Sequence, residues 1–404
     1  MASRFQRRCF RKAPWRPLNL TLGRPRVLTL LLLPLLIPLL VRSAPAPKQV
    51  SAMQRELVIG QSAPFSGPNA PYGHDYRQGA QAWFDAVNRS GGIHGRTLRL
   101  MSLDDRYEPE LTLSNTKRLL QNQQVVALFG FFGTPTSKLI LPLVEATGIA
   151  YVAPLTGARL LREPFRPMVF NLRASYQQEI NLLVDELERA GLQQVAVAYN
   201  KDAYGEDGLR ASKAALNSRG LRVVAIEPLQ RNSTDTDGAA RRIQAADANA
   251  VLIISTYPTS ASLSRNLRRL GSRAQLMNLS PVGISGLEDA LPVGQASGIG
   301  VSQVFPFPWN RRVPVVALYQ QLMQRQQSEA RYGYTSLEGF LAARWLTAAL
   351  EKAGPNPSRA KVVEAFRSLT SLDLGGFKVK LGPCDNQASD LVELTYLGSQ
   401  RWGP

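Results

Sequence analysis

Small hydroxyl residues follow an apolar run at 125–129 and could bind a small anionic group. The run VVALF leads into GFFGTPTS, so Thr134, Pro135, Thr136 and Ser137 come directly after a predicted strand. Ligands of open α/β sheets bind outside the carboxyl ends of the strands. A helix that begins here would also favour a carboxylate at its N-terminus. We therefore expect a ligand site, with a plain strand-to-helix turn as the alternative.

Other predicted strand ends carry residues of the same kind. Leu155, Thr156 and Gly157 end the segment VAPLTG, which repeats the pattern of an apolar run followed by small residues. The remaining candidates are hydroxyl or aromatic residues after other predicted strands: Ser66, Tyr72, Tyr204, Tyr257 and Ser280. Aromatic rings, small hydroxyls and backbone amides suit a buried small polar molecule with an apolar portion. The alternative is that these are loop residues with no common target.

The sequence lacks the usual signatures of catalysis and of metal or nucleotide binding. The chain has two histidines, His74 and His94, and neither has a second His or Cys at the spacing of metal ligands. No GxGxxG follows a predicted strand, and no GxxxxGK[ST] occurs. Ser285 lies in VGISGL, which differs from the GxSxG nucleophile elbow. We expect no enzyme, no cofactor and no metal; an exported hydrolase that uses Ser66 or Ser285 is a remote alternative.

Much of the net charge of +18 comes from the first 50 residues, which hold 10 of the 48 Lys and Arg and no acid. The remaining residues carry 38 basic and 30 acidic side chains, a mild excess with no basic-aromatic stripe, so no nucleic-acid partner is expected. In segment 27–41, 12 of 15 residues are Val, Leu or Ile. This length, with two prolines inside, suits a signal peptide better than a bilayer span. We expect 1–46 to be a signal peptide, or an uncleaved anchor, and 47–55 a lead-in.

Predicted strands and helices alternate through the rest of the chain. The first series has strands at 57–59, 98–103, 125–129 and 149–153, with helices at 73–88, 111–120 and 136–146 between them. The second series has strands at 195–199, 221–226, 251–254 and 276–279, with helices at 177–190, 205–219, 235–246 and 259–270. Strands such as VLII are apolar throughout, as in a parallel sheet that is covered on both faces. Two successive series predict two doubly wound lobes.

The end of the chain departs from this alternation of strands and helices. After a strand at 299–305, helices at 315–326 and 337–353 return, and 377–380 with 391–397 resemble a closing hairpin. Helices that return after a complete second lobe predict that the chain crosses back to the first lobe. We therefore assign the lobes as follows: 56–173 with 306–374 for lobe 1, and 174–305 with 375–404 for lobe 2. Several crossings predict a multi-strand hinge, near Arg173, near Phe305 and near 374–376.

From residue 56 to 404, the chain resembles the type I periplasmic solute-binding proteins of ABC transporters, in the branched-chain amino-acid (Leu/Ile/Val)-binding family. No single motif is diagnostic, but many occur in the family's order. They are SGP with YG, NRSGGIHGRTLRL, DDRYEP, FGFFGTPTS, VAPLTGARLLR, FNLRASY, KDAYGEDG, STYP and GGF. The resemblance implies an α/β fold of two lobes that close on a ligand like a Venus flytrap.

The resemblance also implies roles for candidate residues. Thr134 and the loop 155–157 would hold the carboxylate of the ligand, and Tyr72, Tyr204 and Tyr257 would line the cleft. In this family a carboxylate holds the ligand ammonium, and its position falls at Ser280 here, where the chain has no acid. An ordinary leucine-type ligand is therefore in doubt. An amino acid, a carboxylate or an amide remains open.

The partners follow from the same resemblance. It implies a periplasmic monomer that binds a small-molecule solute and passes it to an ABC permease in the membrane. An alternative in another class is a ligand-sensing module of a signalling system, which an uncleaved N-terminal anchor would favour.

Overall fold

The computed structural model describes residues 56–292, 294–326 and 331–398. The predicted signal peptide or anchor at 1–46 and the lead-in at 47–55 lie outside the described residues. Within the described ranges, no helix is long and apolar enough to cross a membrane.

The first lobe is built on a five-stranded parallel sheet in the order β2-β1-β3-β4-β5. Its strands are β1 (Glu56–Ala63), β2 (Thr97–Asp104), β3 (Val125–Phe129), β4 (Ala150–Val152) and β5 (Val169–Phe170). Its helices from this part of the chain are α1 (Ala70–Arg89), α2 (Pro109–Gln121), α3 (Thr134–Thr147) and the 3-10 turn η2 (Arg159–Leu161). All five residues of β3 are buried, as a strand covered by helices on both faces requires.

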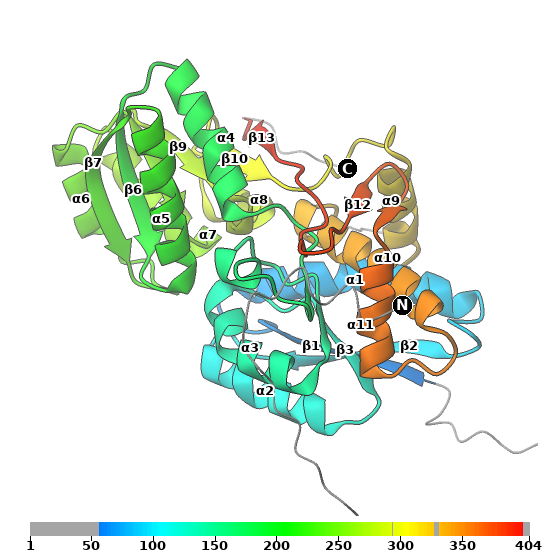
Figure 1. The fold of residues 1–404 in the computed structure, drawn as a ribbon. Helices are drawn as coiled ribbons and strands as arrows, with labels where there is room; N and C mark the ends of the chain where they lie inside the picture. The colour runs from blue at the N-terminus through cyan, green and yellow to red at the C-terminus, as the bar shows by residue number, and fades with distance from the viewer. Residues whose placement is uncertain (1–55, 293, 327–330, 399–404) are drawn as a thin grey trace, which may run out of the picture. The chain divides into compact units, whose positions relative to one another are not determined.

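Three later helices pack against this first part of the chain. They are α9 (Pro314–Gln326), α10 (Tyr334–Ala353) and α11 (Arg359–Ser368), and Figure 1 shows α10 beside α1. Two glycines allow α1 and α10 to approach closely. A Cβ added at Gly79 would lie 1.7 Å from the carbonyl oxygen of Ser336, and one at Gly339 would lie 2.0 Å from that of Tyr76. Backbone packs directly on backbone at this crossing.

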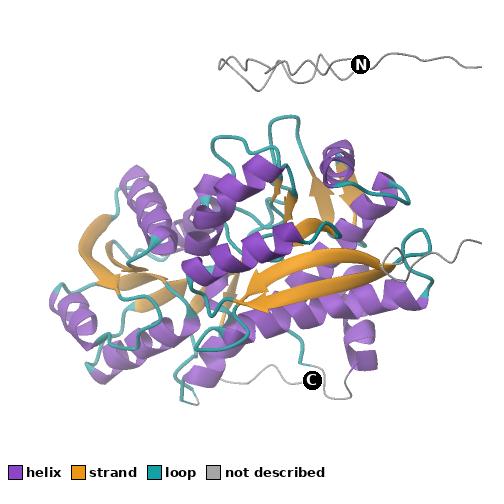
Figure 2. Ribbon diagram, turned by 90° about the horizontal axis from the view of Figure 1, so that it is seen from below, coloured by secondary structure: helices purple, strands orange, loops and turns teal. Residues whose placement is uncertain are grey.

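The second lobe is built on a six-stranded sheet in the order β13-β10-β9-β8-β6-β7, with helices flanking the strands (Figure 2). Its strands are β6 (Gln194–Asn200), β7 (Arg222–Leu229), β8 (Ala250–Ile254), β9 (Gln275–Asn278), β10 (Gly300–Gln303) and β13 (Glu393–Tyr396). Its helices are α4 (Tyr176–Arg189), α5 (Ala203–Ser218), α6 (Asp237–Ala245), α7 (Tyr257–Arg269), the 3-10 turn η3 (Ser280–Val282) and α8 (Ile284–Ala290). Only β13 is antiparallel to its neighbour. The predicted α/β fold with two doubly wound lobes is confirmed.

The chain passes between the two sheets three times: after β5, after β10 and before β13. The predicted hairpin of 377–380 with 391–397 is wrong, because β12 (Lys378–Lys380) pairs with β11 (Ser371–Asp373), and β13 pairs with β10. The turn between β11 and β12 explains the difference. Gly375 and Gly376 have φ of 93° and 89°, and both donate their N–H to the Asp373 carboxylate. Residues 374–376 thus form a tight turn.

Candidate functional site

Thr134 begins α3 at the carboxyl end of β3. The preceding Gly133 has a φ of 95°, and a Cβ there would lie 2.2 Å from the ring of Tyr107, so only glycine fits. Thr134 is fully buried, and its hydroxyl lies 2.7 Å from that of Thr156. Pro135 is half-buried in the first turn of the helix, where its missing N–H costs nothing.

The other hydroxyls of this turn are directed at the turn itself. Thr136 donates to the carbonyl oxygens of Phe132 and Gly133. Ser137 donates to the Gly133 carbonyl at 2.6 Å and lies 2.8 Å from the Tyr151 hydroxyl. Both side chains are fully buried, so they stabilise the start of α3 while Thr134 faces the next loop.

The loop after β4 joins Thr134 to the second lobe. Leu155 pairs with Phe132 in an isolated bridge that holds this loop against the α3 turn. The Thr156 hydroxyl lies 3.0 Å from that of Tyr176. Gly157 accepts a hydrogen bond from the backbone N–H of Tyr176, and a Cβ at Gly157 would lie 2.6 Å from the tyrosine ring. We call Thr134, Thr156 and Tyr176 the hydroxyl cluster.

Helix α4 supplies Tyr176 and a buried acid. A capping box between Ser175 and Gln178 fixes the start of the helix. Tyr176 and Glu179 then lie on its buried face, and burial raises the pKa of Tyr176 to about 12. Glu179 is fully buried, and its Oε2 accepts hydrogen bonds from the Ser280 N–H at 2.8 Å and the Ser302 hydroxyl at 2.6 Å. A carboxylate from α4 therefore reaches Ser280, although position 280 itself carries no acid.

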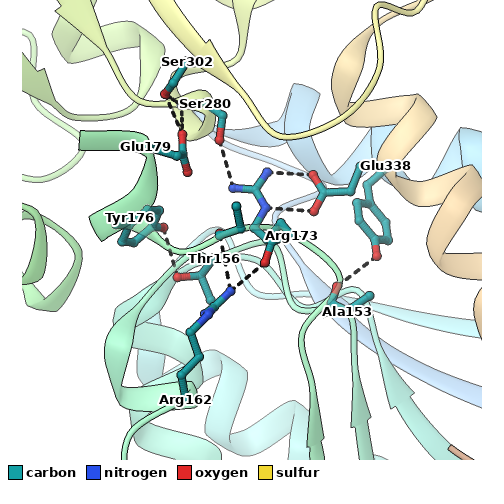
Figure 3. A network of polar contacts seen from close by, with 11 residues as sticks. Ala153, Thr156, Arg162, Arg173, Tyr176, Glu179, Ser280, Ser302 and Glu338 are labelled. Carbon is teal, nitrogen blue, oxygen red and sulfur yellow. Dashed lines mark hydrogen bonds and ion pairs between the residues drawn. The ribbon is translucent and has the colours of Figure 1, made fainter. Parts of the chain in front are cut away.

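Arg173, in the first crossing between the sheets, connects both lobes through its guanidinium (Figure 3). Its Nε and Nη2 bind both oxygens of Glu338 on α10, at 3.0 and 2.8 Å, and both side chains are at most 3% exposed. Its Nη1 donates to the Ser280 hydroxyl at 3.3 Å. Arg162 in turn donates to the backbone carbonyl of Arg173 at 2.8 Å and so holds the crossing segment.

Two arginines accompany two buried carboxylates in this network. Arg173 faces Glu338 and Glu179. Burial raises the pKa of both carboxyl groups, and the charge of Arg173 opposes that rise. Arg162 supplies a second positive charge that also interacts with Glu179, so the four ionised groups balance. The Oε1 of Glu179, which has no partner among the described residues, can still accept a hydrogen bond from a nearby donor.

Tyr204 follows β6 and lies on the other side of the hydroxyl cluster. Its ring packs against Tyr176 with centroids 5.1 Å apart, and its side chain is 2% exposed. Its hydroxyl has no hydrogen-bond partner among the described residues. Burial raises its pKa well above the usual value, so the group is a neutral hydroxyl.

Tyr72 and Tyr257 join the lobes directly. The Tyr72 hydroxyl donates to the carbonyl of Val282 at 2.6 Å and accepts from the N–H of Tyr257 at 3.1 Å. The Tyr257 hydroxyl donates to the carbonyl of Pro68 at 2.6 Å. Ser66 lies in the same first-lobe loop, but its hydroxyl donates to Asp104 and so stabilises the loop itself.

Buried polar atoms without a partner gather at the carboxyl ends of the second-lobe strands. Among the described residues, they include the Asn200 Nδ2, Asp202 Oδ2, Tyr204 hydroxyl, Thr256 hydroxyl, Asn278 Nδ2, Gln303 Nε2 and Glu179 Oε1. Asn200, Asn278 and Gln303 are the last residues of β6, β9 and β10. Parallel strands bring these ends to one edge of the sheet, where open α/β sheets bind their ligands.

Two cavities lie beside this region. The larger, about 530 Å³, is lined by residues including Gly157, Arg162 and Asp207. The smaller, about 30 Å³, is lined by the predicted site residues Tyr72, Tyr257 and Ser280. The smaller cavity thus contains three predicted site residues, and the larger cavity contains Gly157. In the described part of the chain, no group of three or more His, Cys, Asp or Glu could hold a metal ion.

The sequence interpretation missed Tyr176, Glu179 and Glu338, and it treated Arg173 only as part of a hinge. One signal was present. Glu179 precedes Leu183 by four residues, so it lies on the apolar face of the helix predicted at 177–190. A glutamate on an apolar helix face indicates a buried carboxylate that has a polar partner.

The comparisons with known proteins agree with this architecture. The family model described as periplasmic binding protein matches residues 56–400. The crystal structure of a possible leucine/isoleucine/valine-binding protein from Rhodopirellula baltica SH 1 has a TM-score of 0.82 and 30% identity, and the match covers 87% of this chain and 96% of that one. A substrate-binding periplasmic protein from Ralstonia solanacearum has a TM-score of 0.81 and 29% identity, with 85% and 98% covered.

A curated amino acid binding protein from Pseudomonas aeruginosa is 27% identical over 224 residues, which are 55% of this chain and 60% of that protein. The chain spans about three fifths of the length of this and two further curated relatives that it matches. The family model, in contrast, covers nearly all of the described residues. The chain therefore belongs to the periplasmic binding protein family, in the type I fold of the branched-chain amino-acid-binding proteins.

Proposed function

We propose that this protein is an exported receptor that binds a small polar organic solute between its lobes and delivers it to an ABC permease. One observation carries the proposal. Buried polar groups without a described partner gather at the strand ends of the second lobe, and they include those of Asn200, Tyr204, Thr256, Asn278, Gln303 and Glu179. An unpaired buried polar group costs about 1–3 kcal/mol. A bound solute would supply the missing partners and recover part of that cost.

The two sides of the proposed solute site differ in chemistry, which supports a solute with a hydrogen-bond acceptor at one end and a donor at the other. On one side, the hydroxyl cluster and the N-terminus of α3 suit an acceptor such as a carboxylate. On the other side, the Oε1 of the buried Glu179 carboxylate has no hydrogen-bond partner among the described residues. This suits an ammonium or amide N–H. An amino acid combines both ends, which agrees with the names of the amino acid binding and Leu/Ile/Val-binding relatives.

The rest of the function follows from the family. We propose a periplasmic monomer without catalytic activity, whose lobes move about the three crossing segments when the solute enters. The contacts of Tyr72 with Val282 and Tyr257 would then belong to the closed state.

A thermal-shift screen of the purified protein tests this proposal. The panel contains L-leucine, L-glutamine, L-ornithine, L-glutamate, acetate and acetamide, each at rising concentration. We expect Tm to rise with the concentration of at least one amino acid, because a ligand that binds only the folded state stabilises it. Tyr204→Phe should reduce that rise without lowering the Tm of the free protein. A Tm that no member changes, in a protein that also carries no small molecule in native mass spectrometry, would contradict the proposal.

A further inference from the structure

The small cavity next to the Arg173 network has its own polar groups. Tyr257, Trp309 and Tyr334 contribute aromatic rings, and Asp75 and Gln303 contribute polar side chains. Its volume of about 30 Å³ is enough for a group of a few heavy atoms, because one water molecule needs about 10–15 Å³. Ser280 lines this cavity and also binds Arg173, so the cavity adjoins the proposed solute site.

Asp75 provides an acceptor in this cavity. It lies on α1 three residues after Tyr72, which places both side chains on the same helix face. The side chain is half-buried, and no described residue forms a hydrogen bond or an ion pair with its carboxylate. The charges of Arg331 and Asp289 act on its pKa, and these two side chains pair with each other at 2.7 Å. Among the described residues, the Asp75 carboxylate thus has no dedicated partner.

Gln303 provides a donor in the same cavity. It is the last residue of β10 and is 2% exposed, yet its Nε2 has no hydrogen-bond partner among the described residues. A buried side-chain amide without a partner is uncommon in folded proteins. Asp75 comes from the first lobe and Gln303 from the second, so the acceptor and the donor approach the cavity from different lobes.

Asp75 and Gln303 together require a ligand group that both donates and accepts a hydrogen bond. An alkyl group would satisfy neither side chain, and a carboxylate would be repelled by Asp75. An ammonium group would bind Asp75 and leave the Gln303 Nε2 unpaired. A primary amide offers an N–H for Asp75 and a carbonyl oxygen for Gln303, and its planar head group can lie against the aromatic rings.

We propose that this cavity receives a carboxamide or urea-type group at the distal end of the solute, with Asp75 as acceptor and Gln303 as donor. This inference rests on the proposed function and assigns a specificity to the same site. It separates this protein from receptors for purely aliphatic amino acids.

Calorimetric titration with four matched amino acids tests the inference: L-glutamine, L-ornithine, L-glutamate and L-norvaline. They share their α-carboxylate and α-ammonium, and differ at the distal group. We expect L-glutamine to bind at least ten-fold more tightly than each of the others. Asp75→Asn and Gln303→Leu should each reduce that preference at least five-fold. The control Glu110→Gln, an exposed carboxylate at the start of α2, should leave it unchanged.

The outcomes separate the inference from the proposed function. Tighter binding of L-norvaline, L-ornithine or L-glutamate would overturn the inference and keep the receptor. If none of the four binds, native mass spectrometry of the purified protein decides. A bound small molecule that contains an amide or urea group supports the inference, and one without such a group overturns it. If no small molecule is bound and no member of the thermal-shift panel raises Tm, the proposed function fails as well.

Discussion

The strand ends of the two lobes differ in how their polar groups are satisfied. In the first lobe, the hydroxyls of Thr134, Thr136 and Ser137 all have protein partners at the start of α3. In the second lobe, the ends of β6, β8, β9 and β10 carry the unpaired groups of Asn200, Thr256, Asn278 and Gln303. The polar groups at the strand ends are therefore bonded within the protein in the first lobe and without a described partner in the second.

This difference predicts that the two lobes contribute differently to solute binding. The hydroxyls at the start of α3 are satisfied without a solute, so the first lobe can hold this part of the site rigid. The second lobe contains most of the unsatisfied groups, so it gains most from a solute that supplies hydrogen bonds. Substitutions at the start of α3 and in its partners should therefore change stability, and matched substitutions in the second lobe should change affinity.

Glu338→Ala should have the largest effect on stability. The substitution leaves the Arg173 guanidinium buried without its bidentate partner, and breaking a buried ion pair from one side costs about 3–5 kcal/mol. Urea unfolding followed by circular dichroism measures the change. Glu338→Gln, which keeps one acceptor oxygen, should lose less. A loss below about 1 kcal/mol for Glu338→Ala would mean that Glu179 can replace Glu338 as the partner of Arg173.

Glu179→Gln is the matched change in the second lobe. The amide oxygen can still accept from the Ser280 N–H and the Ser302 hydroxyl, so we expect a small change in the free energy of unfolding. Affinity for a solute with an ammonium group should fall by about 1.5–3 kcal/mol, because a charged hydrogen bond is lost. Calorimetry on the wild type and the variant measures both the affinity and the free energy of unfolding. Unchanged affinity together with a large loss of stability would show that Glu179, like the first-lobe residues, stabilises the protein and does not bind the solute.

Thr134→Ala and Tyr204→Phe sharpen the comparison for neutral groups. Thr134→Ala removes a hydroxyl bonded to Thr156, so it should lower stability as well as weaken solute binding, by about 1–3 kcal/mol. Tyr204→Phe removes an unpaired hydroxyl, so it should weaken binding and leave stability unchanged or higher. Thermal unfolding with and without solute separates the two effects. Equal losses of stability in both variants would contradict the proposed difference.

The smallest expected effect is a pH dependence at Asp75. Burial raises the pKa of Asp75 to about 6, while Arg331 opposes and Asp289 adds to the rise. Because the folded-state pKa exceeds the unfolded value, ionisation of Asp75 removes stability as pH rises from about 4 through 6. Asp75→Asn should therefore stabilise the free protein at pH 7.5, and that gain should disappear near pH 4. Urea unfolding at both pH values measures it, and a gain that does not change with pH would contradict this role.

The sequence predicted the architecture well, because strand and helix periodicity are local signals. The alternation of strands and helices, the return of α9 and α10 to the first lobe and the placement of Thr134 after β3 all follow from such signals. The closing hairpin was wrong because the choice of strand partner depends on distant segments: β13 pairs with β10, about 90 residues earlier.

The polar network was harder to predict for a related reason. Arg173 and Glu338 are separated by 165 residues, and the approach of Glu179 to Ser280 spans 101 residues. Such pairs depend on how the lobes pack and leave no local pattern. Unpaired groups are harder still, because a missing partner shows only when every neighbour is known.

Native mass spectrometry of the gently purified protein, with the Glu179→Gln and Tyr204→Phe variants beside it, tests the central claim most directly. We predict that the wild type carries one small organic molecule per chain, and that both variants lose it while they remain folded. The mass of the released molecule would also identify the solute. A small molecule that both variants retain as firmly as the wild type would show that the unpaired groups of the second lobe do not bind the solute.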